Sequence, residues 1–198
     1  MNDLFSRRPI GSAGTEILTL AAAKRSLSIE DDFTGDDVLI QEYLDSAHDY
    51  IGRSFNLQLR KQDLELGFRC FPREDRIQIP IWPIQAVLYF RYIDSSGNSH
   101  DLTEGTGYKT ALDAMPAEVV LPYTGTWPSA VLDTTYPVKV GVTAGYLKGD
   151  SPESYPVPGG LMQAMRLLVG RMYEYNSPEV DDATEETLRR LMSNVRLH

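Results

Sequence analysis

The spacing of apolar residues changes twice along the chain, and this change constrains the fold more than any other feature. From residue 19 to about residue 56 and again from residue 161, apolar residues recur every three or four positions, whereas in between they alternate with polar ones. The first spacing is typical of one face of a helix and the second of a strand. The sequence therefore predicts an α+β fold: N- and C-terminal helices form a small bundle, and an antiparallel β-sheet region is inserted between them.

The same spacing predicts the individual elements. Thr19 can cap a short helix that continues to Leu27, and Thr34 or Asp36 can cap a longer helix that continues to Phe55. Two more helices are expected at residues 161–175 and from about residue 182. Strands are expected at residues 64–68, 77–79, 84–93, 99–102, 118–121 and 138–142. The turn signal at residues 94–98 predicts a hairpin between the third and fourth of these strands.

Proline and glycine mark the boundaries between the predicted parts. We expect a flexible N-terminal arm at residues 1–18, where Pro9, Gly11 and Gly14 fall close together. The helical N-terminal part then covers residues 19–56 and the β insertion residues 57–147. Residues 148–160, rich in proline and glycine, are expected to be a linker, and residues 161–198 supply the C-terminal helices that complete the bundle.

Composition excludes several functional classes. The 19 basic and 28 acidic residues give a net charge of −9. This charge argues against the class of proteins that bind DNA by neutralising its phosphates. The single cysteine, Cys70, excludes an intrachain disulfide framework and a cysteine-rich zinc site. No apolar run reaches the roughly 20 residues of a membrane-spanning helix. We therefore expect a chain that folds around an ordinary core and has no membrane partner.

Residues that could carry chemistry are few, and we expect no enzymatic activity and no cofactor. The acidic residues Asp31, Asp32, Asp36 and Asp37 could hold a divalent cation in a metal-assisted hydrolase, although a solvated loop at a helix start explains them more simply. A second alternative is a β module that binds carbohydrate or peptide through Trp82 and Trp127, each of which precedes a proline. Packing in the sheet core is the simpler explanation of such aromatic residues.

A series of short motifs, each weak alone, occurs in a specific order along nearly the whole chain. They are Leu18–Lys24, Ala47–Arg53, Ile79–Val87, Tyr92–Gly97, Trp127-Pro128, Ala144–Tyr146, Val157-Pro158 and Leu167–Val169. Together they resemble the head-tail connector, or head-completion adaptor, proteins of long-tailed bacteriophages and prophages.

This resemblance implies a structural protein of virion assembly. Such a chain forms a homo-oligomeric ring around the DNA channel, joins the portal protein to the tail or stopper proteins, and lets DNA pass without specific binding. It implies a place in the virion neck, after assembly in the cytoplasm of the bacterial host. Because like charge keeps DNA from adhering, we expect acidic residues to face the channel.

The last predicted helix carries a narrow apolar stripe of four residues, which are Leu188, Leu191, Met192 and Val195. One hypothesis is that this stripe is an interface with a neighbouring subunit or the portal, since it is more than a peripheral helix requires. The alternative is that it packs inside the same chain.

Overall fold

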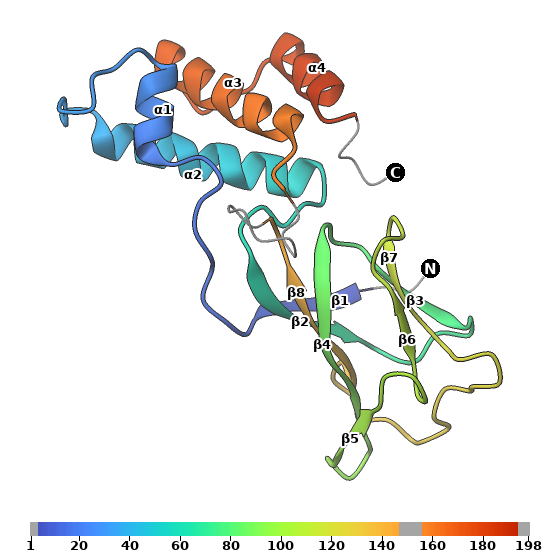
Figure 1. The fold of residues 1–198 in the computed structure, drawn as a ribbon. Helices are drawn as coiled ribbons and strands as arrows, with labels where there is room; N and C mark the ends of the chain where they lie inside the picture. Colours follow the sequence, from blue (N-terminus) through green and yellow to red (C-terminus); the bar gives the residue numbers. More distant parts are fainter. Residues whose placement is uncertain (1–3, 147–155, 194–198) are drawn as a thin grey trace. The chain divides into compact units, whose positions relative to one another are not determined.

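The computed structural model describes residues 4–146 and 156–193, which fold into two compact units (Figure 1). We call residues 1–14 and 60–145 the β unit, and residues 15–59 and 146–198 the helical unit. The predicted α+β class is confirmed, because helices and antiparallel sheets occur in separate parts of the chain. In the described ranges, no helix is both long enough and apolar enough to cross a bilayer.

The β unit consists of two antiparallel sheets. The larger has the strand order β1-β2-β8-β4-β5 and the smaller β3-β7-β6. The strands are β1 (Leu4–Pro9), β2 (Gln62–Phe68), β3 (Arg76–Ile79), β4 (Ile84–Ile93), β5 (Ser99–Leu102), β6 (Lys109–Ala111), β7 (Ala117–Val120) and β8 (Val138–Ala144). One apolar core joins them, to which Leu66 and Val140 contribute from the larger sheet and Ile77 and Val119 from the smaller.

Two strands are absent from the sequence prediction. Leu4–Pro9 pairs with β2, so the prediction of a flexible arm over residues 1–18 is wrong for this segment. Its residues lack an alternating apolar pattern because they form an edge strand, for which backbone pairing with one neighbour is sufficient. Lys109–Ala111 is too short and too polar for its periodicity to be recognised.

The predicted hairpin between β4 and β5 is confirmed. The Asp94 carboxylate accepts hydrogen bonds from the backbone N–H groups of Ser96 and Asn98, at 2.9 and 3.0 Å, and Gly97 adopts a positive φ of 84°. A hydrogen bond with His100, together with these backbone bonds, lowers the pKa of Asp94 below its usual range.

The helical unit contains α1 (Leu20–Ser26), α2 (Asp37–Ser54), α3 (Gly159–Tyr175) and α4 (Asp182–Leu191). Thr19 caps α1 as predicted, since its hydroxyl accepts from the Ala22 N–H. Asp181 caps α4 by accepting from the Thr184 N–H at 2.9 Å. Asn176, with a left-handed conformation, ends α3.

Helices from the two ends of the sequence lie against one another, and two tyrosine hydroxyls connect them. The Tyr43 hydroxyl of α2 donates to the Asn176 side chain at 2.9 Å, and the Tyr173 hydroxyl of α3 donates to Asp36 at 2.6 Å. Asp36 stands at the N-cap position predicted for α2, but its side chain forms no cap hydrogen bond. The hydrogen bond to Asp36 instead raises the pKa of Tyr173.

Candidate interaction surfaces

A buried lysine organises the acidic loop between α1 and α2. Lys24 is only 3% exposed, and its Nζ lies 2.9 Å from the Asp37 carboxylate. The same ammonium donates to the backbone carbonyl of Asp31 at 3.1 Å and to that of Phe33. A buried charge is tolerated only when it is paired and hydrogen-bonded, and these contacts meet that requirement. The loop is therefore tied to α1 and to the first turn of α2.

The four aspartates of this loop do not converge on one point. Asp37 faces Lys24, Asp36 accepts from Tyr173, and Asp31 lies 3.7 Å from the Arg25 guanidinium. Within the described residues, no three His, Cys, Asp or Glu side chains are grouped as metal ligands. A metal-assisted hydrolase needs converging carboxylates to fix the ion, so this geometry does not favour that alternative.

The same loop exposes two apolar side chains. Phe33 is 50% exposed and Val38, in the first turn of α2, is 74% exposed. The Phe33 ring lies directly over Gly35, where an added Cβ would stand 2.8 Å from the ring atom Cζ. Glycine at position 35 therefore leaves space for the ring, and the surrounding backbone is held by Lys24.

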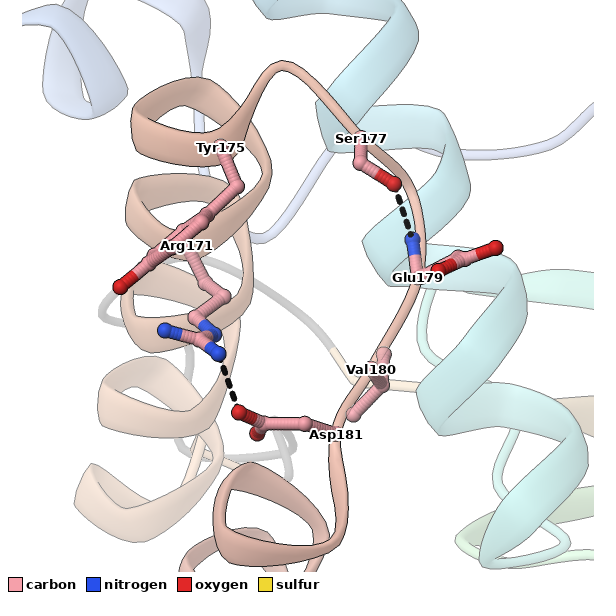
Figure 2. A pocket seen from close by; sticks show the side chains of 6 residues that line it. All are labelled: Arg171, Tyr175, Ser177, Glu179, Val180 and Asp181. Atoms are coloured by element: carbon pink, nitrogen blue, oxygen red, sulfur yellow. Dashed lines mark hydrogen bonds and ion pairs between the residues drawn. The ribbon is translucent and has the colours of Figure 1, made fainter.

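The junction between α3 and α4 forms a hollow of about 310 Å³ (Figure 2). Arg171 pairs with Asp181 and stacks over the Tyr175 ring, with its guanidinium carbon 4.0 Å from the ring centroid. The Ser177 hydroxyl accepts from the Glu179 N–H at 3.2 Å. Hydrogen bonding from Thr184, with Arg171 alongside, lowers the pKa of Asp181. These contacts fix the turn that leads into α4.

A second hollow of about 390 Å³ lies beside the C-terminal half of α2. It is lined by Ser46, Asp49, Tyr50, Arg53, Ser54, Met172 and Pro178. The Arg53 side chain is 84% exposed and lies 3.3 Å from Asp49. Partial burial, together with the nearby Glu185 of α4, raises the pKa of the Tyr50 phenol. The hollow is lined by polar and apolar side chains alike, and the Arg53 guanidinium beside it is accessible.

The stripe predicted as an interface on α4 is mostly internal. Leu188 and Met192 are fully buried within the chain itself, whereas Leu191 is half-buried. Val195 lies outside the described residues. For Leu188 and Met192 the structure thus favours packing inside the same chain, because neither side chain has surface left for a partner.

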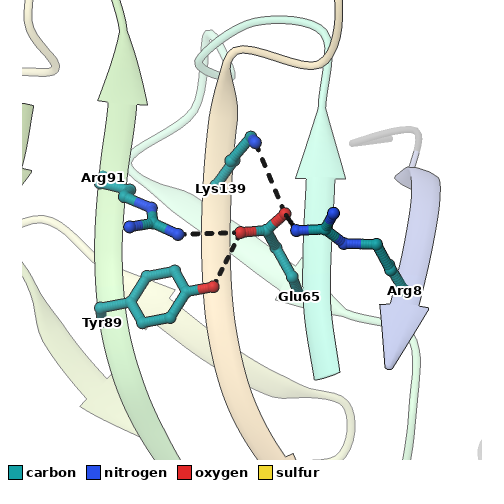
Figure 3. A network of polar contacts seen from close by, with 5 residues as sticks. All are labelled: Arg8, Glu65, Tyr89, Arg91 and Lys139. Atoms are coloured by element: carbon teal, nitrogen blue, oxygen red, sulfur yellow. Dashed lines mark hydrogen bonds and ion pairs between the residues drawn. The ribbon is translucent and has the colours of Figure 1, made fainter. Parts of the chain in front are cut away.

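The β unit carries its main polar cluster on the larger sheet (Figure 3). The Glu65 side chain of β2, only 8% exposed, accepts from Arg8 of β1 at 2.9 Å, from the Tyr89 hydroxyl at 2.8 Å and from Arg91 at 3.0 Å. Lys139 of β8 lies 3.5 Å away. Burial opposes ionisation of Glu65, but the hydrogen bonds from Tyr89 and Arg91 outweigh it and lower its pKa. Four strands therefore meet at one carboxylate.

Gly141 makes this cluster possible. The Tyr89 ring crosses β8 at this residue on its way to Glu65, and an added Cβ would stand 2.3 Å from the ring. Any larger residue would displace the ring and separate its hydroxyl from Glu65. The sequence does not reveal this cluster, because Glu65 occupies the position that faces solvent in a half-buried alternating strand.

The two tryptophans serve the packing of the β unit. Trp82 is buried, and the Trp127 ring stacks on Phe71 at a centroid distance of 5.5 Å. The Trp127 indole N–H donates to the Glu74 carbonyl at 2.7 Å. A binding module needs accessible aromatic faces, so these contacts do not favour the carbohydrate- or peptide-binding alternative.

Comparison with known proteins agrees with the resemblance seen in the sequence. Residues 17–97 match the phage gp6-like head-tail connector protein family. The predicted resemblance is thereby confirmed for a stretch that contains α1, α2 and β2 to β4. No curated protein matches the chain.

Solved structures extend the likeness to the whole fold. A chain in the neck of an empty gene transfer agent (GTA) particle, computed with C6 symmetry, has a TM-score of 0.78 and 20% identity, with coverage of 98% of this chain and 96% of that one. A chain in the virion of the native GTA particle has a TM-score of 0.75 and 20% identity, covering 97% and 95%. A chain in the native GTA neck, computed with C12 symmetry, has a TM-score of 0.71 and 18% identity, covering 98% and 96%. At these identities the likeness establishes the fold.

Proposed function

We propose that this chain is a structural head-tail connector that joins the portal to the tail in the neck of a phage-like particle. It forms a homo-oligomeric ring around the DNA channel, is assembled in the cytoplasm of the bacterial host, and has no catalytic role. The match of residues 17–97 to the head-tail connector family carries this proposal. The likeness of the whole chain to chains from GTA necks supports it.

The ring is supported by the symmetry of those related particles. Their necks were computed with C6 and C12 symmetry, and rotational symmetry requires repeated copies of a subunit. A closed ring needs two different complementary patches on each subunit, which meet head to tail. In this proposal, the helical unit is the bundle formed by the N- and C-terminal helices, and Leu191, which keeps accessible surface on α4, contacts a neighbouring subunit or the portal.

The charge of the chain supports a channel that does not hold DNA. The helical unit contains nine basic and seventeen acidic residues, so its net charge is −8. A surface of this sign repels the phosphate backbone and lets DNA move past it. Purified protein should therefore show no salt-sensitive retention of a DNA duplex at low ionic strength. Tight binding that weakens with added salt would contradict the acidic channel.

Loss of the gene in the particle-producing strain tests the function directly. The expected result is that DNA-filled heads and finished tails accumulate separately, and that the wild-type gene supplied on a plasmid restores joined particles. Electron microscopy distinguishes the three species. Complete, tailed particles in the absence of the protein would overturn the proposal, whereas missing heads would indicate an earlier role.

A further inference from the structure

Residues 30–38, which are the loop before α2 and the start of its first turn and which we call the knob, present apolar surface in a fixed conformation. The side chains of Phe33 and Val38 are at least half exposed. The backbone around Phe33 is nevertheless held in place by the buried Lys24. Removing an ammonium group from water is costly, yet this loop leaves its own aromatic ring in solvent. Ordering a loop before it binds reduces the entropy lost on association. These features are typical of a segment that docks on another surface.

The hollow beside the C-terminal half of α2, which we call the socket, has the complementary properties. Pro178 and the Tyr50 ring provide accessible apolar surface, and Met172 beneath them is buried. Its volume of about 390 Å³ exceeds the roughly 150 Å³ that suffices for a benzene ring in an apolar cavity. Arg53 stands exposed beside it, and its partner Asp49 also lines the socket.

The knob is acidic, whereas the socket holds one exposed cation, Arg53, beside the carboxylate of Asp49. Glu30, Asp31 and Asp32 are consecutive exposed acids next to Phe33. The guanidinium of Arg53 is 84% exposed, and its contact with Asp49 is a surface pair that contributes little to stability. Arg53 can therefore exchange this partner for the knob carboxylates of another molecule.

The knob and the socket lie toward opposite ends of the same helix. Val38 is in the first turn of α2, whereas Tyr50 and Arg53 are near its C-terminus. Tyr50 lies twelve positions after Val38, which corresponds to about 18 Å along the helix axis. One molecule cannot insert its knob into its own socket across this distance. A contact between two different patches of identical subunits is a heterologous contact, which repeats around a ring.

We propose that the knob of each subunit docks in the socket of a second copy of this chain, with Phe33 packed against Tyr50 and Pro178 and the knob acids facing Arg53. This inference rests on the ring-forming function proposed above and names the surfaces that meet in the ring. Salt should weaken the contact, because part of it is electrostatic and lies at the surface.

Cysteine cross-linking tests which surfaces meet. In a Cys70→Ser background, the double variant Asp32→Cys/Ser54→Cys places one thiol in the knob and one at the socket. Under mild oxidation at about 1 mM protein, where even weak contacts are populated, we expect a ladder of covalent oligomers on a non-reducing gel. Each single variant should remain monomeric or stop at dimers, because one thiol per chain can link only two chains and a heterologous contact does not bring two identical positions together.

A matched control uses Asn98, in the turn between β4 and β5 of the β unit. Asp32→Cys/Asn98→Cys should give no ladder. Absence of a ladder from the knob–socket pair, or an equal ladder from the control pair, overturns the proposal. Sedimentation of the unmodified protein and particle production by the knockout strain report ring formation and connector function separately. Failure of the knob–socket contact can therefore be distinguished from failure of the proposed function.

Side-chain truncation measures how much the contact depends on Phe33. Phe33→Ala should weaken self-association about 10- to 30-fold in sedimentation experiments, since buried aromatic anchors dominate such interfaces. Tyr123→Ala removes a fully exposed ring from the β unit and should leave association unchanged. Equal effects of the two substitutions, or none from Phe33→Ala, would contradict the docking of this ring.

Discussion

The helical unit and the β unit are nearly equal in length, with 98 and 100 residues, but they use charge differently. The helical unit has a net charge of −8, whereas the β unit has ten basic and eleven acidic residues and a net charge of −1. In the β unit, three cationic side chains surround one buried carboxylate and connect four strands. In the helical unit, Lys24 fixes one loop while the acids around it stay exposed. Acidic and basic residues thus nearly balance in the β unit, whereas the helical unit keeps a large excess of acids.

The two units can be followed by separate signals. Both tryptophans, Trp82 and Trp127, belong to the β unit, so tryptophan fluorescence reports its unfolding. The described helices all belong to the helical unit, so the circular dichroism signal of helix reports mainly on that unit. Each substitution below should affect one of these signals and leave the other almost unchanged.

The largest effect is expected for Glu65→Ala. This change leaves Arg8, Arg91 and Lys139 without their common carboxylate, and we expect a loss of about 3 kcal/mol in the unfolding free energy of the β unit. Urea unfolding followed by tryptophan fluorescence measures it. Asp75→Asn, which removes the charge from an exposed pair with Arg76, should cost less than about 0.5 kcal/mol. A similar loss from both would show that Glu65 acts as an ordinary surface residue.

The next effect concerns α4. Leu188→Ala should destabilise the helical unit by about 2–3 kcal/mol, because it removes a fully buried side chain. Leu191→Asp, at a half-buried position, should cost less than about 1 kcal/mol and should act mainly on assembly. Thermal unfolding followed by the circular dichroism signal of helix measures the loss of stability for both variants. Sedimentation or particle assembly measures the effect of Leu191→Asp on assembly. Equal losses of stability from both substitutions would place Leu191 in the core instead.

Lys24→Met should cost the helical unit about 2 kcal/mol, since the loop carbonyls and Asp37 lose a charged donor. The matched control is Arg25→Gln, which changes an exposed side chain near Asp31 and should have little effect. Hydrogen exchange of the backbone N–H groups at residues 33–38 should accelerate in the Lys24 variant alone. Unchanged exchange there would mean that the loop keeps its conformation without the lysine.

The smallest effect is a pH dependence confined to the β unit. The pKa of Glu65 is lowered on folding, so its ionised form stabilises the unit above its ordinary value of 4.5. This contribution disappears as the pH falls below 4.5 through the lowered pKa. In Glu65→Gln the contribution is absent at every pH. The difference between wild type and variant in the urea midpoint of tryptophan fluorescence should therefore shrink between pH about 7 and about 3. A constant difference would contradict the assigned ionisation.

Periodicity predicted the elements whose side chains enter a core. Residues such as Leu64, Leu66 and Phe68 mark β2, and Ile40, Leu44 and Ile51 mark α2, because burial selects apolar residues at fixed spacing. Edge strand β1 carries Arg7, Arg8 and Pro9, and nothing in its local pattern indicates the pairing with β2.

The sequence predicted the contacts at the surface less well than it predicted the residues of the cores. Lys24 looks like an ordinary surface lysine because two of its three partners are backbone carbonyls, which are the same for every residue type. Asp36 looks like a helix cap, but its partner Tyr173 is 137 positions away. Such contacts depend on the tertiary fold, and local spacing carries no information about them.

The insertion of the β unit between α2 and α3 also sets the order in which a new chain can fold. After Ser54 leaves the ribosome, 121 more residues must be made before Tyr175 completes α3. At about 5–20 residues per second this takes roughly 6–24 s. Throughout synthesis of that stretch, the apolar face of α2 lacks its partner helix and is exposed to chaperones and to other nascent chains. The helical unit therefore closes last.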